Sequence, residues 1–489
     1  MQGALYANDL FSIGKIDHRI SSSLAENMGR GIYKGIYDPG NDLSDSDGFR
    51  KDVISAVKEL NVPMIRYPGG NFVSSYHWED GIGPKNQRPQ KVDLAWQSIE
   101  SNQFGVDEFM AWLKKVSSTA MMAVNLGTRG IEDACNLLEY CNMDTNTYWA
   151  NKRRENGHEV PYHIKTWCLG NEMDAPWQIG HKTSHEYGEL VNETAKAMRS
   201  LDPTIETVVC GSSNEDTPTF GIWETNVLNE CYDNVDYISM HQYYDLPAKG
   251  TMHHVAKSLR MDQFINSVVA LCDAVKATKK SSKTINISFD EWNVWYHSNE
   301  HDEHVKSWQQ APHRLEDVYN FEDALLVGSS LITLLKHVDR VKIACFAQLV
   351  NVIAPILTSE NGLIEQTIFT PIRDVSKYGY GETLRTSVQS PSYQVPEFGD
   401  VQYLDSVIVK NSADTYTVFA VNRHETETMN LAININDDDR FQETSHLSYS
   451  CSDPKFSNTA DQSVTEETVH DDGQITLKPF SWNVITFKA

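Results

Sequence analysis

The sequence has no long apolar run, which argues against a membrane-spanning helix. No stretch approaches the roughly 18 consecutive apolar residues that a bilayer span requires. Residues 1–20 also lack the apolar segment between a basic start and a small-residue cleavage site that marks a secretory leader. We therefore expect no membrane partner and a location in the cytoplasm.

Paired cysteines and metal-binding motifs are missing as well. The eight cysteines are scattered without a CxxC pair, and several stand inside apolar runs, such as Cys168 and Cys345. This spacing is typical of reduced core residues in a cytoplasmic protein. His181 and His185 are four positions apart, but no HExxH pattern or third ligand accompanies them. We therefore predict no metal site and no cofactor.

Basic residues are scarce. The chain has 42 Lys and Arg against 67 Asp and Glu, a formal net charge of -25. Such a field repels phosphate backbones, so nucleic acid is excluded as an expected partner. A neutral sugar neither gains nor loses from this charge.

Glycine-rich phosphate turns are also absent, whereas short β-branched runs alternate with helical periodicity from about residue 30 to 380. No GxGxxG or GxxxxGK[ST] motif occurs, and this disfavours an open doubly wound sheet. Eight strands joined by helices such as 49–60 and 321–337 predict a (β/α)8 TIM barrel. The predicted strands are 31–33, 62–66, 121–125, 164–169, 205–210, 235–240, 284–289 and 341–346.

The pattern changes after about residue 384. Runs of period two, separated by Asp, Asn, Ser and Gly, predict a β-sandwich, which we expect to be jelly-roll-like. A chain of 489 residues is long enough for a large domain and a smaller one. We therefore expect a barrel over 18–383 and an all-β sandwich over 384–489. The N-terminal segment, 1–17, is a candidate for an extra strand of the sandwich.

Two glutamates stand at the ends of predicted strands. Glu172 follows the fourth strand and Glu291 follows the seventh, and strand ends at the C-terminal face carry the chemistry of such barrels. Opposed carboxyl groups are what glycoside hydrolysis needs, since one protonates the leaving oxygen and the other attacks or stabilises the sugar carbon. A separation of about 5 to 5.5 Å predicts retention and roughly 6.5 to 9.5 Å predicts inversion. The sequence leaves this distance open.

A single glutamate at a strand end is more commonly an ordinary loop carboxylate. Here, however, polar residues also follow other predicted strands, and their joint occurrence favours an active site at one face of the barrel. These residues are Arg66, Asn71, Asn171, Tyr243 and Gln348.

Four long segments carry a specific pattern: RYPGGNFVSSYHWEDGIGP (66–84), WCLGNEMDAPWQIGH (167–181), ISMHQYY (238–244) and SFDEWNVWYH (288–297). The pattern resembles the α-L-arabinofuranosidases of glycoside hydrolase family 51. The likeness extends almost end to end, through 94–98 and 321–356 and into a C-terminal region of the expected length.

The resemblance implies a role for each of these residues. Glu172 would be the general acid/base and Glu291 the nucleophile of a retaining enzyme, and Asn171 would hold the sugar 2-hydroxyl. The resemblance also implies exo-acting release of terminal arabinofuranosyl residues from arabinan or arabinoxylan oligosaccharides, by a homo-oligomer, specifically a hexamer. The substrate-binding residues that it implies are Glu26, Arg66, Asn71, Asn171, Tyr243, Gln348, Trp96 and Trp295.

Two positions depart from the family pattern. Ala175 stands where the family typically has glycine, and residues 363–365 replace a Trp-Arg pair that many members carry. We expect both departures to lie outside the catalytic core, and the second to affect preference beyond the first sugar.

Two alternatives remain open. One is a β-glycan hydrolase on the same barrel, which would have an open cleft in place of a pocket. The other is an inactive sugar-binding or scaffold protein, which would have lost one of the carboxylates, Arg66 or Asn171. All four residues are present.

Overall fold

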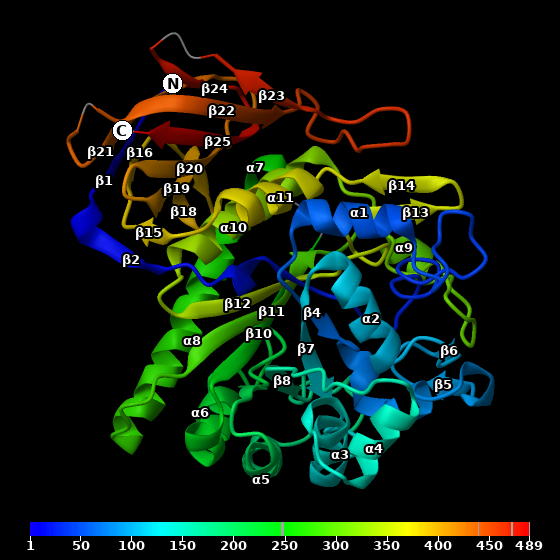
Figure 1. Cartoon of the computed structure of the whole chain (residues 1–489). Coiled ribbons are helices and arrows are strands. Elements are labelled where there is room, and N and C mark those ends of the chain that lie inside the picture. Colours follow the sequence, from blue (N-terminus) through cyan, green and yellow to red (C-terminus); the bar gives the residue numbers. More distant parts are fainter. Residues whose placement is uncertain (246–248, 439, 471–472, 489) are drawn as a thin grey trace.

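The structure is a computed structural model and describes residues 1–245, 249–438, 440–470 and 473–488. Eight parallel strands close into a barrel, with each strand paired to the next along the chain and the last to the first. A β-sandwich caps one side of the barrel, and both chain termini lie in it (Figure 1). The predicted fold, a (β/α)8 barrel followed by an all-β domain, is confirmed. The barrel strands are β3 (Ser22–Leu24), β4 (Met64–Tyr67), β7 (Thr119–Val124), β8 (Thr166–Leu169), β9 (Glu206–Val209), β10 (Tyr237–Tyr244), β11 (Asn286–Val294) and β12 (Val341–Ala347).

The first barrel strand was predicted wrongly. Residues 31–33 are not a barrel strand, and β3 (Ser22–Leu24) occupies that position, paired with β12 and β4. All three residues of β3 are buried, so the strand shows no alternation of polar and apolar side chains. Two of its three residues are serines, which are not expected in a buried strand. Ser23 is tolerated inside the barrel because its Oγ donates a hydrogen bond to the carbonyl of Phe346 at 2.8 Å.

Helices surround the barrel (Figure 1). Helix α1 buries Val53, Val57 and Leu60 on one face and ends at Asn61, whose φ of 52° stops the helix. The helices are α1 (Lys51–Leu60), α2 (Val106–Val116), α3 (Ile131–Asn142), α4 (Tyr148–Glu155), α5 (Ser184–Leu201), α6 (Ile222–Cys231), α7 (Thr251–His254), α8 (Ser258–Lys279), α9 (Asn299–Asp302), α10 (Phe321–Lys336) and α11 (Phe369–Tyr378). Among the described residues, no helix is both long and apolar enough to cross a bilayer.

The sandwich consists of a seven-stranded and a four-stranded sheet, in the orders β2-β15-β19-β20-β25-β22-β23 and β16-β1-β21-β24. The N-terminal segment supplies β1 and β2 to these sheets, and β1 pairs in parallel with β21. The strands are β1 (Gln2–Ala7), β2 (Ser12–Lys15), β15 (Glu382–Leu384), β16 (Ser387–Gln389), β19 (Leu404–Ser412), β20 (Thr415–Asn422), β21 (Met429–Ile435), β22 (Gln442–Ser450), β23 (Glu466–Val469), β24 (Ile475–Leu477) and β25 (Ser481–Lys488). We propose domain boundaries after residues 17 and 383, with β15 crossing the second.

Three short hairpins complete the strands: β5 (Lys91–Asp93) with β6 (Ser98–Glu100), β13 (Ile356–Ser359) with β14 (Gly362–Glu365), and β17 (Ser392–Val395) with β18 (Gly399–Gln402). The first of them carries the loop that contains Trp96. The eight cysteines, all within the described ranges, form no disulfide.

Candidate active site

Glu172 lies three residues beyond the end of β8, in a strained backbone conformation. Its φ of 43° falls in the left-handed region, which residues other than glycine seldom adopt. The carboxyl group accepts hydrogen bonds from His241 Nδ1 at 2.9 Å and from Trp177 Nε1 at 2.9 Å. Ala175 lies in the turn that follows Glu172, where its backbone N–H donates to the backbone carbonyl of Glu172 at 2.9 Å.

Glu291 lies within β11, not after it, because the strand runs on to Val294. Arg66 Nη1 donates to its Oε1 at 2.6 Å, and the hydroxyl of Tyr243 donates to its Oε2 at 2.9 Å. Arg66 Nη2 donates to Asn171 Oδ1 at 2.7 Å. One fully buried guanidinium therefore orients both Glu291 and the asparagine that precedes Glu172.

His241 links the two glutamates. Its Nδ1 is 2.9 Å from Glu172 Oε1 and 3.6 Å from Glu291 Oε2, and its Nε2 is 2.8 Å from Asp290 Oδ1. One carboxylate oxygen of Glu172, one of Glu291 and a ring nitrogen of His241 all lie within 4.8 Å of one another. The two carboxyl groups thus meet although they are far apart in the sequence.

Glu26 lies two residues beyond β3, beneath the loop that follows β4. Its Oε1 accepts hydrogen bonds from the backbone N–H of Phe72 at 2.9 Å and from Trp96 Nε1 at 2.8 Å. Its Oε2 accepts one from Gln348 Nε2 at 3.1 Å. Gly69 is required here, because a Cβ at that position would lie 2.6 Å from Glu26 Cγ.

The remaining predicted residues join the same network. Asn71 Oδ1 accepts a hydrogen bond from Asn171 Nδ2 at 3.1 Å. The ring of Trp295 meets that of Tyr243 edge to face, with centroids 5.4 Å apart. The structure therefore brings all ten predicted site residues to the C-terminal end of the barrel. The hairpin around residues 363–365 instead hydrogen-bonds through Gly362 to Arg50.

The charges in this network differ sharply from those in water. Burial raises the pKa of Glu26 to about 8, and the nearby charge of Glu291 adds to this effect. Burial alone would lower the pKa of His241, but the charge of Glu291 and the hydrogen bonds to Asp290 and Glu172 outweigh it and raise that pKa to about 10. Near neutral pH, Glu26 is therefore a neutral donor and His241 is a cation.

Three residues of the network were not predicted from the sequence as site residues: His241, Asp290 and Trp177. His241 and Asp290 belong to the strand-end segments, but a lone histidine and an aspartate next to a glutamate gave no separate signal. Trp177 is 53% exposed and still donates to Glu172. Its spacing of five residues from Glu172 was the only available clue.

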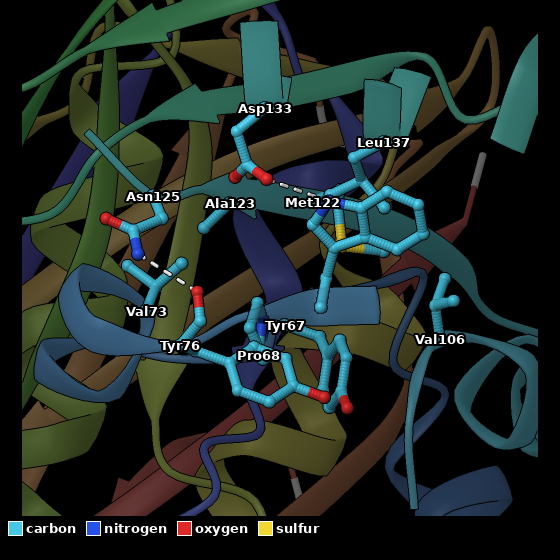
Figure 2. Close-up of a pocket in the computed structure, with 11 residues that line it drawn as sticks. Tyr67, Pro68, Val73, Tyr76, Val106, Met122, Ala123, Asn125, Asp133 and Leu137 are labelled. Atoms are coloured by element: carbon cyan, nitrogen blue, oxygen red, sulfur yellow. Dashed lines mark hydrogen bonds between the residues drawn. The ribbon is translucent and has the colours of Figure 1, made fainter. Parts of the chain in front are cut away.

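A small internal cavity of about 20 Å³ lies beside the barrel wall, among Tyr67, Val73, Met122, Asp133 and Leu137 (Figure 2). Trp78 Nε1 donates to Asp133 at 3.2 Å on its border. Burial raises the pKa of Asp133 to about 6. The cavity has room for about one water molecule, so it is too small for a sugar.

Comparisons with known proteins agree over nearly the whole chain. Residues 56–260 match the family model described as Alpha-L-arabinofuranosidase 1 domain, and residues 290–484 match the Alpha-L-arabinofuranosidase C-terminal domain. An intracellular exo-α-(1→5)-L-arabinofuranosidase from Halalkalibacterium halodurans is 52% identical over 483 residues, which cover 97% of each chain. One from Bacillus subtilis is 52% identical over 487 residues, covering 98% of this chain and 97% of the relative.

Solved structures give the same result. A family 51 α-L-arabinofuranosidase from Bifidobacterium longum superposes with a TM-score of 0.95 at 39% identity, covering 99% of each chain. The α-L-arabinofuranosidase from Thermotoga maritima, in its arabinose complex, gives a TM-score of 0.89 at 33% identity over the full length of both chains. The chain therefore belongs to the α-L-arabinofuranosidases of glycoside hydrolase family 51.

Proposed function

We propose that this protein is an exo-acting, retaining α-L-arabinofuranosidase. It removes terminal, non-reducing arabinofuranosyl residues from arabinan or arabinoxylan oligosaccharides. Glu172 is the general acid/base and Glu291 the nucleophile. The observation that carries the proposal is the approach of the two carboxyl groups, which have oxygens within 4.8 Å of each other and both lie beside Nδ1 of His241.

This short separation supports retention over inversion. An inverting enzyme keeps its carboxyl groups roughly 6.5 to 9.5 Å apart so that a water molecule fits between them and the sugar, whereas a retaining enzyme holds them at about 5 to 5.5 Å. In the first step, Glu172 donates a proton to the leaving oxygen while Glu291 bonds to the sugar carbon. In the second step, Glu172 takes a proton from water, and that water displaces Glu291.

The neighbours of each carboxyl group favour this division of roles. Glu291 receives hydrogen bonds from a guanidinium and a phenol, which stabilise its charged form and hold its oxygens in place. Asn171, oriented by Arg66, supplies an amide for the sugar 2-hydroxyl. The other proposed substrate-binding residues are Glu26, Asn71, Tyr243, Gln348, Trp96 and Trp295.

An inactive scaffold protein is less consistent with these contacts. Both carboxyl groups, Arg66 and Asn171 are not only present but joined in one buried network. Such a network has no structural purpose that an apolar cluster would not serve as well, because buried ion pairs add little net stability.

The decisive experiment uses three aryl glycosides. The protein is incubated with an α-L-arabinofuranoside, a β-D-xyloside and a β-D-glucoside, and the first-formed anomer is followed by proton NMR. We expect turnover of the arabinofuranoside with the α-anomer appearing first. If the β-anomer appears first, the mechanism is inverting and not retaining. A preference for the glucoside would support a β-glycan hydrolase. Glu291→Gly should abolish turnover even with an activated aryl group.

We also propose a cytoplasmic location and a homohexamer. Several relatives are named as intracellular enzymes, and the substrate would be short oligosaccharides already inside the cell. Light scattering after size exclusion tests the assembly, because six chains of 55.4 kDa have a combined mass of about 332 kDa. A mass near 55 or 111 kDa would exclude the hexamer and leave the proposed chemistry untouched.

A further inference from the structure

Asp290, the residue before Glu291, has no place in the two-step reaction, yet its carboxylate is bound as closely as those of the two glutamates. Its Oδ1 faces His241 Nε2 at 2.8 Å, and its Oδ2 accepts the hydroxyl of Ser288 at 3.1 Å. Only 1% of Asp290 is exposed, and Cys168 Sγ lies 3.9 Å from its Oδ2. Both oxygens are thus occupied inside the protein, so Asp290 does not touch substrate.

An irregular strand allows this arrangement. Consecutive residues of a regular strand point to opposite faces, so Asp290 and Glu291 should not reach the same side chain. The pairing of β11 with β10 shifts between Ser239 and His241, and its pairing with β12 shifts between Phe289 and Trp292. Bulges of this kind re-aim side chains next to active sites. Here both neighbouring carboxylates approach the ring of His241.

We propose that Asp290 is a positioning residue that acts through His241 to hold the acid proton of Glu172 on the oxygen that serves the leaving group. The proposal rests on the acid/base role proposed above for Glu172. The two hydrogen bonds of His241 form a continuous chain from Asp290 Oδ1 to Glu172 Oε1, with lengths of 2.8 and 2.9 Å.

The direction of each hydrogen bond explains the effect. Carboxylate oxygens lie 2.8 Å from Nε2 of His241 and 2.9 and 3.6 Å from its Nδ1, and they hold the ring as a cation. Both nitrogens then carry protons, and Nδ1–H donates to Glu172 Oε1. The acid proton of Glu172 must then be on Oε2, the oxygen that also meets Trp177 Nε1. The raised pKa of His241, about 10, is consistent with this cation.

Removing the charge of Asp290 should reverse the second bond. In Asp290→Asn, the amide oxygen still accepts a hydrogen bond from Nε2–H of His241. Without the charge of Asp290, however, the imidazole loses its Nδ1 proton to solvent and becomes neutral. The bare Nδ1 is then an acceptor, and Glu172 donates its own proton to it through Oε1. The acid proton would point away from the leaving group although every heavy atom stays in place.

The surroundings of Asp290 favour its ionised form. Burial alone would raise the pKa of Asp290, but the charge of Arg66 and the hydrogen bond and charge of His241 outweigh burial, and the net effect is a lowered pKa. The titratable and charged groups that interact with it come from five barrel strands or their ends: Arg66 on β4, Cys168 on β8, Cys210 directly after β9, His241 on β10 and Cys345 on β12.

A second buried carboxylate offers a matched control. Asp323 is also fully buried between two histidines, with its oxygens 2.9 Å from His254 Nε2 and 2.7 Å from His297 Nε2. It caps helix α10 and contacts neither Glu172 nor Glu291. Asp323→Asn therefore removes an equivalent buried charge without touching the proposed chain.

The test measures kcat/KM for a series of aryl α-L-arabinofuranosides whose leaving groups differ in basicity. General acid catalysis contributes about 10²- to 10⁴-fold and matters most for basic leaving groups. We expect Asp290→Asn to lose about 100-fold or more on an alkyl or unsubstituted phenyl leaving group but less than about 10-fold on 4-nitrophenyl. The decline in kcat/KM that deprotonation of His241 causes, expected near pH 10 in the unmodified protein, should move to lower pH in Asp290→Asn, because His241 then loses its proton more readily. Asp323→Asn should change kcat/KM by the same factor for basic and for activated leaving groups.

A double variant decides whether Asp290 acts through His241. If it does, Asp290→Asn combined with His241→Gln should be no worse than His241→Gln alone, whereas independent roles would give multiplied losses. Equal losses on all leaving groups, or multiplied losses, would overturn the proposal. Should Asp290→Asn not fold, His241→Gln must show the same leaving-group dependence, and its absence would also overturn it. Glu172→Ala separates the two hypotheses, because a flat leaving-group dependence there refutes the acid role itself.

Discussion

Replacement of Glu26 by glutamine should remove an alkaline limit on activity. Glu26 has a pKa of about 8, against an ordinary value of 4.5, mainly because it is buried. This difference corresponds to a cost of about 5 kcal/mol for ionising the group in place. The neutral carboxyl has Oε1 filled by two N–H donors and carries its proton on Oε2, where it can donate to a sugar hydroxyl. Above pH 8 this donor is replaced by a second negative charge near Glu291.

We expect kcat/KM of the unmodified protein, measured with an aryl arabinofuranoside from pH 5 to 10, to fall above an apparent pKa near 8. Glu26→Gln stays neutral at every pH, so the fall near pH 8 should disappear, and a decline should remain only near pH 10, where His241 loses its proton. Its amide would face the amide of Gln348 and lose one hydrogen bond, which costs about 1 kcal/mol and lowers the plateau roughly 5-fold.

The control is Glu26→Asp, which keeps an ionisable carboxyl and should keep an alkaline limb on a lower plateau. The stability of the fold should also depend on this carboxyl group. A carboxyl whose folded pKa is raised destabilises the fold progressively as pH rises from its unfolded value of 4.5 toward 8. An alkaline limb that is unchanged in Glu26→Gln would show that another group causes it. A glutamine variant inactive at every pH would show that the ionised form is needed.

Three further changes have expected outcomes. Arg66→Leu leaves the buried charge of Glu291 without its cation, which costs about 3 to 5 kcal/mol, so kcat/KM should fall roughly 10²- to 10⁴-fold; activity within threefold of normal would contradict the pairing. Tyr243→Phe removes one hydrogen bond to Glu291 and should cost about 10-fold in kcat/KM with KM little changed. Burial opposes the raised pKa of His297, but its hydrogen bond to Asp323 prevails. The charged pair of His297 and Asp323 therefore stabilises the fold, fully below pH 6.5 and progressively less as the pH rises through the raised pKa of His297. His297→Asn should accordingly lower the urea midpoint more at pH 6 than at pH 9.

Much of the fold could be predicted from the sequence because the barrel repeats one pattern. Seven of the eight strands were placed correctly, although β10 and β11 continue four and five residues beyond their predicted ends. The exception, β3, is three residues long and contains two serines, so neither hydrophobicity nor alternation distinguishes it. The error had a consequence for the site. Since the first strand was placed at residues 31–33, Glu26 did not stand at a predicted strand end and entered only through resemblance to the family.

The sequence predicted which residues form the candidate site better than it predicted the hydrogen bonds between them. The predicted ends of the fourth, sixth and seventh barrel strands pointed to Glu172, Tyr243 and Glu291, although the last two lie within β10 and β11. The bulges that turn Asp290 and Glu291 toward one histidine depend on how three strands align, and a single strand's sequence does not record that alignment. His241 was therefore quoted in a motif but given no role.

The charge balance of the site shows why these connections matter. Two fixed cations, Arg66 and His241, stand among four carboxyl groups, namely Glu26, Asp290, Glu172 and Glu291. Burial keeps Glu26 neutral near pH 7, and the charges of Asp290 and Glu291 offset those of Arg66 and His241. Both glutamates approach His241, but Arg66 donates to Glu291. The division of roles that we propose for two chemically identical side chains therefore depends on their neighbours, and a change to Asp290 or Arg66 should disturb it as surely as a change to either glutamate.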